Sequence, residues 1–350
     1  MRHKKSVLLL VLTTGIITLQ NCSKKDDAAT GTVTQPRLPA TAFNYSNVSF
    51  PAHISAALLL NDNTPAGNPI TDNGATLGRV LFYDKNLSKN NTISCGSCHK
   101  QENSFTDNVQ FSKGFDGGFT TRTSMNTLNL RFYKSGKMFW DERSNTLEDQ
   151  ILQPIQNHVE MGMTLTDLVT KLKTLDYYPD LFTKAFGSNS IDTTRISRAV
   201  AQFLRSIVTY QAKYDRVKQG LESFTADESD GEQLFLNAVP PGPGGGPTCA
   251  GCHTPPEFLT SQPQGPFQLA DPTDAGILNQ HRFKAGSLRN ITNTTALFHN
   301  GSIANVQAML ASTIPAHGVA PQDRQKIFAF LQTLTDNTVT TDVRFSDPFK

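Results

Sequence analysis

The chain has 350 residues, which is room for two modest domains, and its 37% hydrophobic content is that of a globular protein. A formal net charge of only +2 argues against the basic surface that nucleic-acid binding requires. With 24 glycines and 19 prolines the chain is loop-rich, but this content does not indicate disorder.

The start of the chain has the pattern of an export signal. A basic N-terminus precedes an apolar run, residues 7–19, that is too short for a stable membrane span. The sequence LQNC at residues 19–22 is similar to the lipobox of bacterial lipoproteins, whose cysteine is acylated and becomes the mature N-terminus. We therefore predict a lipoprotein signal peptide at residues 1–22, lipidation of Cys22 and a polar tether at residues 23–50. An ordinary secretory signal with a chance cysteine is the alternative.

The other four cysteines form two pairs, and a histidine directly follows each pair. This C-x-x-C-H pattern is the attachment signature of c-type haem. Two thiols add to the two vinyl groups of one porphyrin edge, and the next residue places its imidazole under the iron as the proximal ligand. The sequence therefore predicts two covalently bound haems c, attached by Cys95, Cys98 and His99 and by Cys249, Cys252 and His253.

Three other uses of the cysteine pairs are less consistent with the pattern. A four-cysteine zinc site usually brings its pairs within about 15–20 residues, whereas Cys95 and Cys249 are 154 positions apart. A thioredoxin-like motif needs a βαβ context that neither pair has. Structural disulfides can form after export, but a two-residue gap makes a strained and reducible bridge.

A short repeat precedes both haem motifs. The pattern Gly-x-x-Leu-Phe begins at Gly78, 17 residues before Cys95, and again at Gly231, 18 residues before Cys249. A glycine in a helix allows a crossing helix to approach closely, and the Leu-Phe pair can cover a haem edge. We therefore expect the N-terminal helix of a small c-type cytochrome fold to be present twice.

The rest of the chain is mainly helical in its periodicity. Apolar spacing predicts helices at residues 146–156, 164–175, 193–218, 305–310 and 323–334. Pro154 should kink or end the first of them, and a capping box at residues 225–228 should open the helix before the second haem motif. Strand signals are few. We predict a mainly α fold of two cytochrome-c-like haem domains, residues 51–220 and 221–340, with long haem-wrapping loops.

Eight short motifs follow one another along the chain: FYDKNLS (82–88), SCGSCH (94–99), FTD (105–107), MFWDER (138–143), LEDQ (147–150), VEMG (159–162), GSLRNI (286–291) and FHNG (298–301). In order and spacing this set resembles the bacterial di-haem cytochrome c peroxidases. The resemblance covers residues 75–335. A methylamine-utilisation protein that oxidises tryptophan residues in a partner belongs to the same superfamily.

The resemblance implies different tasks for the two haems. The haem on His99 is the peroxidatic one, with an open distal face, and the haem on His253 passes electrons in from a donor. Glu160 matches the family's distal acid–base, which moves a proton between the peroxide oxygens. Gln150 matches a distal amide that hydrogen-bonds peroxide, and Trp140, the single tryptophan, matches a residue that couples the haems. Ordinary surface or core positions are the alternatives for these three residues.

The sequence departs from the family pattern on the distal side of the first haem. In many members a histidine of the loop after the first motif caps the peroxidatic iron until the other haem is reduced. Here Phe115 falls at that place, and no histidine lies between His99 and His158. The resemblance thus implies a first iron without a protein sixth ligand at rest.

A second departure concerns the distal ligand of the second haem. The family position, a methionine or a tyrosine, is Thr313 here, which is a poor ligand for iron. Met309, one helical turn earlier, and His317 are the alternatives, and Met309 is the more typical high-potential ligand. His299 and Arg289 match residues near this haem that support propionates or the domain interface.

The implied function is reduction of hydrogen peroxide to water with electrons from a small donor protein, a cytochrome c or a cupredoxin. A di-haem oxidase that modifies a partner protein and a pure electron-transfer cytochrome are the alternatives. The expected location is the periplasm or cell envelope, with the lipid anchor as the membrane attachment and no nucleic-acid partner. A calcium ion between the domains and a homodimer are compatible with the resemblance.

Overall fold

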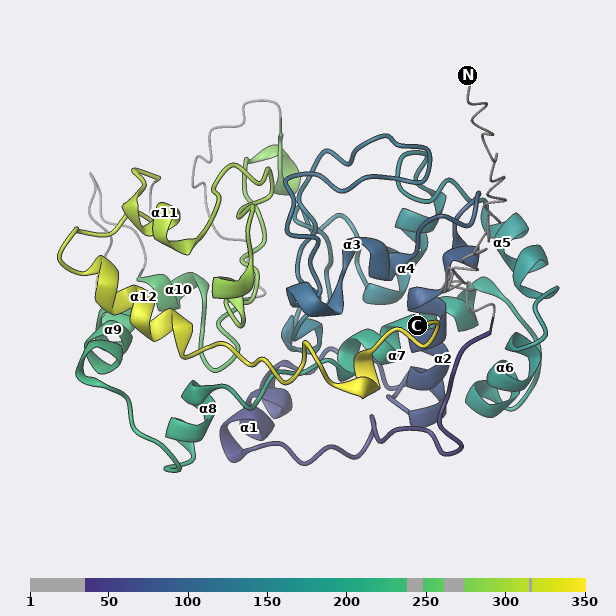
Figure 1. Ribbon diagram of the computed structural model, residues 1–350, viewed down its shortest axis with the longest axis horizontal. Helices are drawn as coiled ribbons and strands as arrows, with labels where there is room; N and C mark the ends of the chain where they lie inside the picture. The colour runs from purple at the N-terminus through teal and green to yellow at the C-terminus, as the bar shows by residue number, and fades with distance from the viewer. Residues whose placement is uncertain (1–34, 238–247, 261–273, 315–316) are drawn as a thin grey trace, which may run out of the picture. The chain divides into compact units, whose positions relative to one another are not determined.

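The computed structural model describes residues 35–237, 248–260, 274–314 and 317–350 (Figure 1). The predicted signal peptide and Cys22 lie outside these residues. Within them the fold consists of α-helices and short 3-10 turns, with isolated bridges such as Lys100–Thr106 and no β-strand. This confirms the mainly α prediction. No helix in the described ranges is long and apolar enough to cross a membrane.

The helices follow one another in chain order, separated by long loops. The first seven are α1 (Ala52–Asn61), α2 (Asp72–Tyr83), α3 (Cys95–Cys98), α4 (Leu147–Gln156), α5 (Leu165–Leu172), α6 (Tyr178–Phe186) and α7 (Thr193–Ser206). The others are α8 (Lys213–Lys218), α9 (Ala226–Asn237), α10 (Cys249–Cys252), α11 (Val306–Ala311) and α12 (Arg324–Gln332). Each haem motif thus forms a short helix, α3 or α10, that follows a longer one.

Buried apolar side chains form two separate cores. The first is built mainly from residues 45–208, and the second from residues 214–334. The C-terminal segment returns to the first core, where Val339 and Phe345 are buried. Tyr83 donates a hydrogen bond to the Phe345 carbonyl at 2.7 Å. Figure 1 shows this yellow segment running beside α7 and α2.

One helix crossing is common to both cores, and a glycine lies at each crossing. A Cβ added to Gly78 of α2 would be 2.0 Å from the Ala199 carbonyl oxygen of α7. A Cβ added to Gly231 of α9 would be 2.0 Å from the Lys326 carbonyl oxygen of α12. Only glycine permits such an approach, because any Cβ would overlap the facing backbone. The repeated Gly-x-x-Leu-Phe pattern therefore corresponds to a repeated helix crossing, as the sequence predicts.

The prediction of one long helix at residues 193–218 is wrong, because two helices occupy this range. α7 ends at Ser206, residues 207–212 are not helical, and α8 starts at Lys213. The Asp336 carboxylate accepts hydrogen bonds from the Tyr210 and Gln211 amides, both at 3.0 Å. These bonds replace helical ones, and the β-branched run from Ile207 favours extended backbone.

Pro154 lies inside α4, which continues past it to Gln156, so the proline does not end the helix early. The capping box predicted before α9 is confirmed. At the start of α9 the Thr225 amide donates to a Glu228 carboxylate oxygen at 2.7 Å, and the Glu228 amide donates to the Thr225 hydroxyl at 3.3 Å. This reciprocal pair is the predicted capping box.

The described end of the predicted tether, residues 35–50, packs on the protein. Tyr45 is buried in the first core, and its hydroxyl donates a hydrogen bond to the Arg344 carbonyl at 2.6 Å. The Arg37 amide donates to the Pro348 carbonyl at 2.7 Å. The two ends of the described chain therefore meet on the first core.

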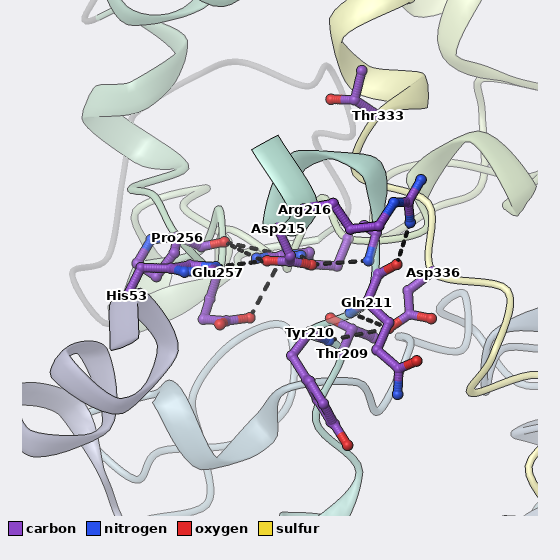
Figure 2. A network of polar contacts seen from close by, with 12 residues as sticks. His53, Thr209, Tyr210, Gln211, Asp215, Arg216, Pro256, Glu257, Thr333 and Asp336 are labelled. Atoms are coloured by element: carbon purple, nitrogen blue, oxygen red, sulfur yellow. Dashed lines mark hydrogen bonds and ion pairs between the residues drawn. The ribbon is translucent and has the colours of Figure 1, made fainter. Parts of the chain in front are cut away.

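A buried ionic network joins α1, α8 and the loop after α10 (Figure 2). Arg289 forms a two-point ion pair with Asp215, with N–O distances of 2.6 and 2.9 Å, and both side chains are fully buried. His53 of α1 contacts Asp215 at 2.9 Å. Glu257 lies 3.7 Å from Arg289, and burial raises the pKa of its carboxyl to about 8. The network links an element of the first core to elements of the second.

Candidate haem and active site

The first C-x-x-C-H motif is held by its own short helix and by two acceptors. Ser94 caps α3, and its amide takes part in a capping box with the Ser97 hydroxyl at 3.0 Å. The Nδ1 atom of His99 lies 3.1 Å from the Phe105 carbonyl oxygen and 3.2 Å from the Ser124 hydroxyl. These contacts fix the plane of the imidazole.

The second motif has the same local construction. The Thr248 hydroxyl accepts a hydrogen bond from the Gly251 amide at 3.2 Å and caps α10. The Nδ1 atom of His253 lies 3.2 Å from the Phe258 carbonyl and 3.1 Å from the Gly286 carbonyl. A histidine anchored through Nδ1–H offers Nε2 as its ligating nitrogen.

The protonation states suit a proximal iron ligand. Burial lowers the pKa of His253 to about 4, and it also lowers the pKa of His99 below its usual value. Both imidazoles are therefore neutral at pH 7, as metal binding requires.

The four cysteines of the two motifs are half-buried free thiols. Burial raises the pKa of Cys95 to about 12 and those of Cys98 and Cys249 to about 11, which disfavours the thiolate that zinc binding and thiol exchange need. No cluster of three or more His, Cys, Asp or Glu in the described part of the chain could hold a metal ion.

A cavity of about 840 Å³ adjoins the first motif, and we call it the first cavity. Its lining includes all three attachment residues of that motif together with the three residues predicted from the sequence as catalytic: Cys95, Cys98, His99, Gln150, Glu160 and Trp140. The structure thus brings together side chains that lie up to 65 positions apart in the sequence.

Helix α4 and the turn after it position the two polar residues predicted as catalytic. Gln150 lies on α4, and Glu160 lies in the turn that follows it. The Asn157 side-chain oxygen accepts hydrogen bonds from the Val159 amide at 2.8 Å and the Glu160 amide at 3.2 Å. Burial raises the pKa of the Glu160 carboxyl, and the nearby Arg143 guanidinium opposes this rise. A carboxyl in this environment is shifted toward the pH at which acid–base catalysts operate.

Trp140 lies at the junction of two cavities. It lines the first cavity, and it also lines a second cavity of about 200 Å³ that adjoins the second haem motif. Its indole N–H donates to the Thr123 carbonyl at 2.8 Å, and its own carbonyl accepts from the Lys284 amide at 2.8 Å. Phe139 and Glu142 flank it with φ of 71° and 53°. Its side chain is therefore held by the first half of the chain and its backbone carbonyl by the second.

The second cavity contains both candidate distal ligands of the second haem. Met309 and His317 line it with Cys249, Cys252 and His253, and Thr313 is not among its lining residues. The rest of its lining is largely apolar, with Phe235, Leu288, Ile291, Leu297 and Phe298 among the residues.

Of the two further residues matched to the second haem, only one faces its cavity. His299 lines the second cavity and stacks on Phe283, with ring centroids 3.6 Å apart. Arg289 lies in the buried network with Asp215 and donates to the Pro256 carbonyl at 2.6 Å. It lines neither cavity.

Phe115, which falls at the family's capping-histidine position, does not reach the first cavity. Its ring lies against Gly162, where an added Cβ would be 2.4 Å from the ring. Ser112 and Phe119 of the same loop reach the cavity instead. His158, which is exposed, is the one histidine besides His99 among its lining residues.

Sequence reasoning missed two cationic residues of the site. Lys284 is buried and lines both cavities. Arg122 pairs with Asp141 beside Trp140 at 2.7 Å and with Asp274 of the second half at 2.7 Å. Neither residue stands in a pattern with a recognisable chemistry. The one available signal is that Lys284 precedes the GSLRNI motif by two residues.

Comparison with known proteins identifies relatives of the whole arrangement. The profile of the family described as "Di-haem cytochrome c peroxidase" matches residues 72–223. The chain is 31% identical to the cytochrome c551 peroxidase of Nitrosomonas europaea, over 83% of this chain and 89% of that protein. It is 30% identical to the methylamine utilization protein MauG of Methylophilus methylotrophus, over 70% and 73%.

The chain belongs to the di-haem cytochrome c peroxidase/MauG family. The fold agrees with this. The crystal structure of a MauG-like protein associated with microbial copper homeostasis superposes with a TM-score of 0.74, at 27% identity, over 88% of this chain and all of that one. The diheme peroxidase BthA of Burkholderia thailandensis has the same fold, with a TM-score of 0.63.

Family membership implies two c-type haems, and the residues described above fit them. Each motif offers two thiols and a neutral imidazole whose Nδ1 is already hydrogen-bonded. The first cavity has the size of a cofactor site, about 300–1,000 Å³. The second is smaller, and the fit there rests on its donor set and apolar lining. A calcium ion between the domains and assembly into a homodimer stay predictions.

Proposed function

We propose that this protein reduces hydrogen peroxide to water with electrons from a small redox protein. The observation that carries the proposal is that Glu160 and Gln150 line the same cavity as His99. A carboxyl and an amide thus line the cavity in which Cys95, Cys98 and His99 would hold the first haem. A cytochrome that only transfers electrons needs neither group.

Glu160 is the proposed acid–base. Its carboxylate takes the proton from the near oxygen of peroxide and returns it to the far oxygen, which then leaves as water. Gln150 is proposed to orient the substrate by hydrogen bonding. When bound, the haems supply the iron at which the O–O bond breaks and the path for the two electrons that, with two protons, convert one peroxide into two water molecules.

Trp140 is the proposed electronic link, because it lines both cavities. Electrons from the donor enter at the second motif, with Met309 as the proposed distal ligand and His317 as its alternative. The proposed donor is a cytochrome c or a cupredoxin. The proposed location is the periplasm or cell envelope, with a lipid anchor on Cys22.

A second candidate is oxidation of a partner protein with the same two haems. The similarity to MauG proteins and to a MauG-like structure favours it. The threonine at position 313, where the protein-oxidising branch has tyrosine, weighs against it.

Steady-state turnover of the holoprotein with peroxide and a reduced cytochrome c or cupredoxin tests the proposal. We expect peroxide-dependent oxidation of the donor at a rate that saturates with both substrates. Reaction with peroxide that leaves every donor reduced would refute the peroxidase and favour the oxidase. Haem staining and intact mass should show two haems per chain.

A further inference from the structure

Lys284 occupies an unusual place for a lysine. Its side chain is only 4% exposed, and it lines both the first and the second cavity. Its backbone amide donates to the Trp140 carbonyl at 2.8 Å. Lysine is almost never fully buried unless it is paired, because removing an ammonium from water is costly. The presence of a buried lysine at this position therefore needs a physical explanation.

The surroundings of the ammonium hold it in place without neutralising it by a close ion pair. The Nζ atom lies 3.7 Å from the centre of the Tyr133 ring, and it donates a hydrogen bond to the Lys137 carbonyl. Glu142 is the nearby carboxyl; it is itself buried, and one of its oxygens has no hydrogen-bond partner. Burial raises the pKa of Glu142, because it disfavours the carboxylate form of this side chain. The negative charge that would balance the Lys284 ammonium is therefore less stable there.

We propose that Lys284 is a positioning residue for electron transfer: its ammonium supplies the positive charge that sets the reduction potentials of the two haem sites on either side of Trp140. This inference deepens the proposed function and rests on the two haems it requires. A cation in a low-dielectric interior stabilises a neighbouring centre that has gained an electron.

The same charge makes the potentials sensitive to pH. Burial lowers the pKa of Lys284 to about 8, and Glu142 partly opposes this. Tyr133 faces the ammonium too, but burial raises its pKa well above that range, and Lys137 acts on Glu142 as a second cation. As pH rises through about 8, Lys284 loses its proton and the midpoint potentials should fall.

Spectroelectrochemical titration of the holoprotein at a series of pH values tests this inference. The decisive variant is Lys284→Met, which keeps the length of the side chain and removes its charge. We expect lower midpoint potentials at pH 7 than in the parent, and loss of the fall near pH 8. Lys134→Met is the control, because it removes a lysine charge at an exposed position next to Tyr133 in the sequence and should leave both features intact.

The inference is overturned if the parent potentials do not change between about pH 7 and 9, a result that needs no variant. It is also overturned if Lys284→Met titrates like the parent. If Lys284→Met binds less haem, Lys284→Arg serves instead: it keeps the charge at high pH, so its potentials should no longer fall near pH 8. Because these potentials are measured without peroxide, a protein that shows them but fails in the turnover assay refutes only the proposed function.

Discussion

The two haem motifs share one supporting structure and differ in what lies above it. In both halves a glycine allows two helices to cross closely, and in both the proximal histidine is anchored through Nδ1 to a backbone carbonyl. The first cavity is larger and carries Glu160 and Gln150. The second is smaller, largely apolar, and carries Met309 and His317.

This difference fits the two tasks proposed for the haems. The support of the haem motif and of its histidine is the same in both halves, so the proposed division of tasks rests on the other side chains of the two cavities. A carboxyl and an amide in the first cavity suit a small substrate, and a soft or imidazole ligand in the second suits electron transfer.

The largest expected effect comes from removing the proposed acid–base group of the first cavity, Glu160. Glu160→Gln should lower peroxide turnover by about 10²–10⁴-fold with both haems still bound, because general acid–base groups contribute that much. The measurement is kcat/KM with peroxide, alongside haem content. Glu102→Gln, an exposed carboxyl beside α3, should retain normal turnover. Comparable rates for both variants would mean that the difference between the two cavities lies elsewhere.

The shared helix crossing predicts equal damage in both halves. Gly78→Ala and Gly231→Ala should each destabilise the protein by about 1–3 kcal/mol or more, because the new Cβ overlaps a backbone carbonyl. Gly67→Ala is the control, since nothing lies within 4 Å of its added Cβ. Thermal unfolding of the holoproteins measures the three variants. A tolerated alanine at Gly231 would show that the second half does not depend on the crossing.

A smaller effect should appear in the pH profile of the first site. Since proton abstraction needs the Glu160 carboxylate, turnover should fall as pH decreases through its pKa, which burial places above the usual value. The Arg143 charge lowers that pKa, so Arg143→Gln should raise it and move the acid limb to higher pH, by less than about one pH unit. A limb that moves to lower pH instead would rule out Glu160 as the titrating group.

Removal of the His158 side chain is expected to have no effect on the resting state of the first haem. The first cavity offers His158 as its only histidine beyond the proximal one, and His158 is exposed at its wall. We expect a high-spin ferric signal from the resting protein, the same signal in His158→Ala, and activity without prior reduction. Electron paramagnetic resonance measures this. Two low-spin haems in the parent and one in the variant would identify His158 as a cap.

Those features of the fold that depend on local chemistry were predictable. The C-x-x-C-H spacing, the glycine repeat and the box at Thr225 each express a constraint within a few residues, and the structure contains the corresponding elements. The break after α7 was not predictable, because the acceptor that competes for the Tyr210 and Gln211 amides is Asp336, more than 120 positions away.

The candidate site was predictable in membership and less so in its distal details. The family motifs named Glu160, Gln150 and Trp140, and the structure places all three on one cavity wall. Phe115 was misplaced because its glycine-rich loop has no periodicity that fixes which side chain points inward. Lys284 was missed because burial of a charge is a property of the assembled halves and leaves no mark on a single segment.

The return of the C-terminal segment to the first core constrains the order in which this protein can mature. Val339 and Phe345 complete a core whose other residues precede position 260, and the Arg79 side chain donates to the Val343 carbonyl at 2.8 Å. Under the proposed export the last residues would leave the membrane last. The half that emerges first would then complete its packing only when the end of the chain arrives, and its cysteines would stay open to haem attachment until that point.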